Sequence, residues 1–211
     1  MIDAAVLPAF VLAAAVLVAI PGPAILYIVS TGIGRGRGAA LASMAGIEVG
    51  ALFHVFAATV GVSAIVASST VAFLILKYAG AAYLIYLGWK TLRSKESPVL
   101  AHLTGETSNA SAFGRGIVVN ILNPKVALFF LAFLPQFVDP GRGRVTGQFL
   151  VLGFVFIGVA IVIDSIYALA SGAIGGLLNR SPRWARGQKR VAGFTYLALG
   201  ASAALTGNNS K

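Results

Sequence analysis

Residues 10–23 of the chain read FVLAAAVLVAIPGP, an apolar run that ends in Pro21-Gly22-Pro23. A second apolar stretch is interrupted in the same way by Asn123-Pro124-Lys125. Proline has no amide hydrogen and its ring clashes with the carbonyl four residues earlier, so each interruption predicts a broken helix. Unpaired backbone is costly in hydrocarbon unless protein or a water-filled cavity receives it. Two such breaks in corresponding halves are therefore typical of a transporter's binding site.

The composition indicates an all-α integral membrane protein. Hydrophobic residues make up 58% of the 211 residues and charged residues 10%, with a mean hydropathy of +0.89. These values lie far outside the averages of soluble globular proteins. No polar stretch is long enough to fold separately, so we expect one transmembrane domain over residues 1–211.

A spanning helix needs about 20 mostly apolar residues, and by this rule the chain has six candidate segments. They cover residues 7–31, 39–67, 71–92, 117–138, 149–178 and 191–206. Each half contains a proline-broken helix, a long helix with one internal acid, and a helix near a basic end. Because three spans are an odd number, the second half would enter the membrane in the opposite direction, as a 3+3 inverted repeat.

The two halves would be residues 1–93 and 113–211, joined by a polar, flexible loop over residues 94–112. With six spans, eleven of the sixteen Lys and Arg residues fall in loops on one side and three on the other. This asymmetry places the basic loops in the cytoplasm and both termini outside, in a multi-pass protein. It also accounts for the net charge of +10 through orientation and anionic lipids, so we expect no nucleic-acid partner.

Each break is expected to begin a new helix. Asn123 can cap the helix that starts at Pro124, since proline needs no partner at the first position, and Gly22-Pro23 can be interpreted in the same way. Two helix N-termini aimed into the bundle would form a site for an anionic group such as a carboxylate. The alternative is that each proline only kinks a helix for packing.

Three ionisable residues fall inside apolar segments, and such residues are costly and commonly functional. Glu48 or Asp164 could bind a substrate ammonium or cycle a proton, while Lys125 could meet a carboxylate or neutralise an acid. The alternative is a buried structural ion pair, because burial demands pairing whether or not transport uses it.

The second segment carries a row of mostly small residues at close to four-residue spacing, which lets helices approach closely. The row consists of Gly46, Gly50, His54, Ala58 and Gly61. We expect the three glycines to serve helix packing, and the row is compatible with a homodimer. His54 could relay protons, but a packing role or a hydrogen bond to a neighbouring helix is the simpler interpretation.

Catalytic and cofactor sites are not indicated by the sequence. The chain has no cysteine, and no Ser-His-Asp set or metal-ligand spacing is present, so we expect no enzyme, no metal and no cofactor. A lipid-handling protein or a structural membrane subunit would be compatible with the same composition. These remain the alternatives to a transporter.

Several motifs together resemble the LysE/RhtB family of amino-acid exporters. They are Pro21-Gly22-Pro23, the Gly46-x3-Gly50 pair, Asn120-Ile-Leu-Asn123-Pro124-Lys125 and Phe133-Leu-Pro-Gln-Phe137. The resemblance covers nearly the whole chain. It implies export of amino acids or close derivatives across the bacterial inner membrane, powered by the proton or membrane gradient. It also implies that Pro21, Gly22, Pro23, Asn123, Pro124 and Lys125 correspond to the family's signature positions. We predict that these residues, together with Asn120, bind the substrate.

Overall fold

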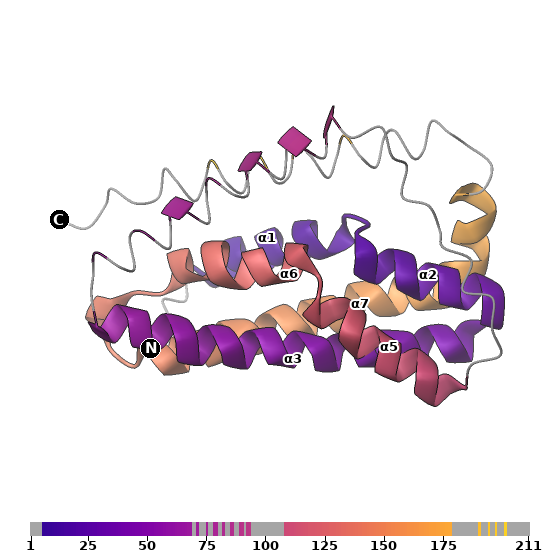
Figure 1. Cartoon of the computed structure of the whole chain (residues 1–211), viewed down its shortest axis with the longest axis horizontal. Coiled ribbons are helices and arrows are strands. Elements are labelled where there is room, and N and C mark those ends of the chain that lie inside the picture. The colour runs from indigo at the N-terminus through magenta and orange to yellow at the C-terminus, as the bar shows by residue number, and fades with distance from the viewer. Residues whose placement is uncertain are drawn as a thin grey trace.

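A computed structural model describes residues 6–68 and 108–178, together with isolated helical positions between 71 and 93 and between 190 and 201. Every regular element in these ranges is a helix (Figure 1). The elements are α1 (Leu7–Ala19), α2 (Pro23–Arg35), α3 (Arg37–Ser68), α5 (Asn109–Ile121), α6 (Pro124–Leu128), the π-helix η1 (Phe129–Phe133), the 3₁₀-helices η2 (Leu134–Phe137) and η3 (Pro140–Arg142), and α7 (Val145–Leu178).

The first proline motif separates α1 from α2, and the two helices meet at 51°. Pro23 occupies the first position of α2, where its missing amide costs nothing. Gly22 stands before it in an extended conformation. The break predicted at Pro21-Gly22-Pro23 is therefore confirmed.

The second motif separates α5 from the stretch that begins with α6, and these meet at 45°. Asn123 accepts a hydrogen bond from the amide of Lys125 at 3.1 Å, and Pro124 is the first helical residue, as the sequence predicts. The start of the segment differs from the expectation. Helix α5 begins at Asn109, capped by the Ser108 side chain, so it includes residues assigned to the flexible loop and precedes the expected start at 117.

Helices α3 and α7 are unbroken and long, and they match the second and fifth predicted segments. Both are apolar and long enough to cross a membrane, and each broken pair would make one further span, giving up to four in the described ranges. The predicted segments 71–92 and 191–206 lie outside the described residues apart from isolated positions. The count of six spans thus stays a prediction.

The two broken pairs run in opposite directions along the long axis of the molecule (Figure 1). In this view the chain runs from left to right through α1 and α2, and from right to left through α5 and α6. Helices α3 and α7 also run opposite ways, and each contacts the other's broken partner. Both breaks lie near the middle of the bundle.

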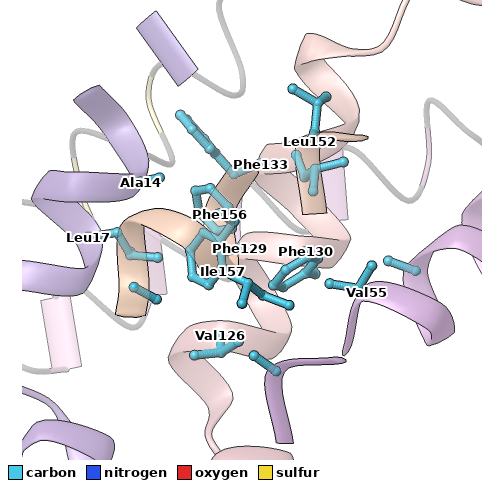
Figure 2. Close-up of a cluster of buried hydrophobic side chains, with 14 of the residues drawn as sticks. Ala14, Leu17, Val55, Val126, Phe129, Phe130, Phe133, Leu152, Phe156 and Ile157 are labelled. Atoms are coloured by element: carbon cyan, nitrogen blue, oxygen red, sulfur yellow. The ribbon is translucent and has the colours of Figure 1, made fainter. Parts of the chain in front are cut away.

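The larger buried cluster packs α1 and η1 against α7 (Figure 2). Phe129 of η1 lies at its centre, with its ring centroid 4.8 Å from that of Phe156 on α7 and 5.8 Å from that of Phe10 on α1. Aromatic pairs at such separations add to the free energy gained by burying their area. This cluster fixes α6 and η1 beside α1, on one side of both breaks.

Helices α3 and α5 approach each other closely through small residues. A Cβ added to Gly46 would collide with the backbone carbonyl of Phe113, and one at Gly50 would lie 2.8 Å from the carbonyl oxygen of Ile117. At Gly61 an added Cβ would meet no described atom within 4 Å. The first two glycines therefore set the distance between α3 and α5, whereas no such contact is described for Gly61.

Candidate functional site

The first break leaves backbone carbonyls without their usual helical partners. The carbonyl of Ala19 would normally accept from the amide of residue 23, which is a proline. It accepts instead from the hydroxyl of Tyr167 on α7, at 2.7 Å. The next carbonyl, that of Ile20, accepts from the ammonium group of Lys125 on α6, at 2.6 Å.

The second break is satisfied in a similar way. The carbonyl of Asn120 would normally accept from the amide of residue 124, which is again a proline. It accepts from the amide of Asn123 at 3.0 Å and from Nε2 of His54 on α3 at 2.9 Å. A carbonyl only accepts, so His54 Nε2 carries the hydrogen. The buried His54 ring also stacks on Phe130, with the ring centroids 6.2 Å apart.

The two asparagines of the second motif hold the backbone in place. Asn120 donates from Nδ2 to the carbonyl of Ile47 on α3 at 2.7 Å. Asn123 donates to Oδ1 of Asn120 at 3.4 Å while it caps α6 through Lys125. Both side chains are buried and line the cavity described next, but each has protein partners.

A small cavity lies between the two breaks. It is lined by residues of both broken pairs, α3 and α7, namely Leu17, Val18, Gly22, Ala24, Ile25, Ile47, Glu48, Ala51, Asn120, Asn123, Lys125, Val126, Phe156, Ala160 and Asp164. Its volume is about 30 Å³, room for about two water molecules. Apolar side chains form most of its wall, and its charged residues are Glu48, Lys125 and Asp164.

Two acids face this cavity from opposite long helices. Glu48 of α3 and Asp164 of α7 are 7% and 3% exposed and lie close enough for their charges to interact. Among the described residues, no group outside the pair donates to either oxygen of Glu48 or to Oδ1 of Asp164, and a proton on one of the two carboxyl groups would be shared with the other. Lys125 is the nearby cation, but its ammonium is bound to Ile20.

The lysine stem lies directly against the first break. A Cβ added to Gly22 would be 3.3 Å from Cδ of Lys125 and 3.7 Å from its ammonium nitrogen. The φ of Gly22 is −130°, which any residue can adopt, so the glycine leaves room rather than supplying an unusual conformation. The two proline motifs, 100 residues apart in sequence, are thus in direct contact.

The structure brings most of the predicted site residues together. Six of them line the cavity, namely Gly22, Asn120, Asn123, Lys125, Glu48 and Asp164. His54 does not line the cavity, but it binds the second break at the carbonyl of Asn120. Sequence reasoning missed Tyr167. Its signal was available, because Tyr167 follows Asp164 by three residues and so lies on the same face of α7.

A helical membrane bundle whose two broken helices place charged groups around a buried cavity has the architecture of a transporter. The family model described as LysE type translocator matches residues 15–207. The chain belongs to this family, and the resemblance found in its motifs is confirmed.

Relatives match along most of their length. A homoserine/homoserine lactone efflux protein of Salmonella typhimurium is 33% identical over 92% of this chain and 93% of its own. A leucine efflux protein of Enterobacter sp. is 28% identical over 91% and 92%, and a membrane protein of Vibrio cholerae is 31% identical over 91% and 93%. No solved structure matches the chain significantly.

Proposed function

We propose that this protein exports amino acids or close derivatives from the cytoplasm. The family and the efflux activity named for the relatives support this function. The observation that carries it is the cavity between the breaks, which presents an ammonium group and two carboxyl groups in a mostly apolar wall. Groups of both signs within one small space suit a zwitterion.

The substrate's carboxylate would bind at the first break. Lys125 now donates to a neutral carbonyl, and a carboxylate is a stronger acceptor for an ammonium group. Helix α2 begins beside it, and no side chain caps its first amides in the described structure. Positive partial charge at this helix end favours an anion. The substrate's ammonium would face Glu48 and Asp164, which line the same cavity.

The halves would move to admit a substrate. A whole amino acid is larger than about two water molecules, so the described cavity is a closed form that must widen. The opposed directions of the broken pairs support a six-helix 3+3 inverted repeat, in which one half rocks against the other (Figure 1).

We further propose that the protein works in the bacterial inner membrane, with its basic loops in the cytoplasm, and that the proton or membrane gradient drives export. Its partners would be the amino-acid substrate and membrane lipids. A homodimer would need a contact other than Gly46 and Gly50, because α5 already covers these positions.

Amino-acid pools inside and outside cells test the export function. Cells expressing the wild type, or Pro124→Ala with Lys125→Ala at matched membrane abundance, are fed dipeptides and the pools are followed over time. We expect the wild type to lower the internal concentration of one or a few amino acids and the double variant to lose this effect. Identical pools in both strains and in cells with an empty vector would refute export and favour the lipid-handling or structural alternative.

A further inference from the structure

The pair Glu48 and Asp164 lacks a donor that its burial requires. Both residues are more than nine-tenths buried, and three of the four carboxyl oxygens receive no hydrogen bond from any described residue outside the pair. A buried polar group without a partner costs free energy, and an unpaired buried charge costs far more. The pair must therefore hold a proton or another donor when the cavity is closed.

The neighbouring titratable groups do not supply that donor. One N–H of the Lys125 ammonium on α6 donates to Ile20, and no hydrogen bond joins this ammonium to the unpartnered oxygens of the pair. The single hydroxyl hydrogen of Tyr167 on α7 is donated to Ala19. On the remaining helices, the His54 ring of α3 donates to Asn120 and the hydroxyl of Tyr27 of α2 donates to Ala112 at 3.0 Å. The donors of Tyr167, His54 and Tyr27 are thus used by backbone carbonyls, and Lys125 does not bind the unpartnered acid oxygens in the described structure.

The charges around the cavity do not balance either. Two carboxylates face one ammonium group, so full ionisation would leave one negative charge uncompensated in a buried site. One further positive charge at the pair would neutralise the set. A proton provides this charge at the pair. The ammonium group of an amino acid provides it as well, while the carboxylate of the same molecule would face Lys125 and the N-terminus of α2.

We propose that Glu48 and Asp164 form a single cation site, which a proton and the substrate's ammonium group occupy in turn. This inference rests on the proposed export function and deepens it. When the ammonium group arrives, the carboxyl O–H bond breaks and its proton passes to water on the open side. The N–H groups of the substrate then take the place of that donor. Because the two ligands exclude each other, their exchange couples export to proton entry.

Proton release on binding tests the inference directly. The purified full chain is titrated in weak buffer with leucine, homoserine or propylammonium, which carries the cationic group without a carboxylate. Bound ligand and released protons are measured together. We expect a release approaching one proton per ligand bound, at pH values where the empty site is protonated.

Variants locate the source of the proton. Glu48→Gln and Asp164→Asn should each bind these ligands at least tenfold more weakly and release few or no protons. Asp139→Asn removes an exposed carboxylate next to η3 and should behave like the wild type. If a variant fails to fold, the stoichiometry of the wild type still decides the question.

The outcomes separate the two proposals. If amino acids bind to the wild type but neither they nor propylammonium releases a proton, the shared site is wrong while the export function stands. If propylammonium releases a proton but no amino acid binds, the shared cation site stands and the export function fails. If no ligand releases a proton under any condition, the inference is overturned.

Discussion

The ammonium group of Lys125 donates to the carbonyl oxygen of Ile20 at 2.6 Å and so joins the two helix breaks across 105 positions of sequence. Ile20 caps the C-terminal end of α1, where the carbonyls of the helix carry partial negative charge. Lys125 therefore binds both breaks. Its side chain donates to the backbone of the first, and its backbone amide donates to the side chain of Asn123 at the second. Any ligand that draws Lys125 away would loosen the contact between the halves.

Replacing Lys125 should separate its structural role from its charge. In Lys125→Met the carbonyl of Ile20 loses its buried donor, which typically costs about 1–3 kcal/mol of stability, and the acids lose their neighbouring cation. We expect a lower melting temperature in detergent and loss of efflux. Lys125→Arg keeps the charge, but its planar guanidinium group must fit against Gly22, so we expect efflux and melting temperature between those of Lys125→Met and the wild type. Efflux by Lys125→Met at the wild-type rate would contradict the proposed role.

His54 is expected to be structural. His54→Phe keeps an aromatic ring against Phe130 but removes the donor to Asn120, which retains its bond from Asn123. The loss of one donor should cost about 1 kcal/mol and leave the pH dependence of efflux unchanged. Tyr167→Phe, which removes one donor from the first break, is the matched comparison. If the pH profile of efflux changes in His54→Phe but not in Tyr167→Phe, His54 takes part in proton transfer and its role is not only structural.

The breaks were predictable because proline acts locally. The missing amide and the clash with the preceding turn depend only on the residue and its neighbours in sequence. The carbonyls that Pro23 and Pro124 leave free are also predictable, four positions earlier at Ala19 and Asn120. Which side chain satisfies them is a matter of tertiary packing, and for that reason Tyr167 was missed.

The start of α5 was missed for a different reason. Residues 109–116 include Asn, Ser, Arg and two Gly, so they fall below the hydropathy expected of a spanning segment. Ser108 nevertheless caps a helix there, and Gly116 lets α5 lie against the backbone of Ser43 on α3. Close packing on α3 stabilises this turn where composition alone would not.

Glycines on α3 should differ sharply in their tolerance of a methyl group. Gly46→Ala places a Cβ against the backbone of Phe113, which can move only if α5 shifts, so we expect reduced expression and a lower melting temperature. Gly61→Ala meets no described atom and gains helix propensity worth about 1 kcal/mol. Thermal unfolding in detergent compares the two. Equal tolerance would show that α3 and α5 do not need this close approach.

A bulkier residue at position 160 should reduce the size of substrate that the cavity accepts. Ala160 lines the cavity one turn before Asp164 and is 4% exposed. Ala160→Leu adds three carbon atoms to a space that holds about two water molecules. We expect efflux of leucine to fall more than that of smaller amino acids, with a raised KM. Ala173→Leu makes the same change at an exposed position of α7 and serves as the control. If efflux of large and small substrates falls in parallel while the melting temperature is unchanged, this wall of the cavity does not contact the substrate's side chain.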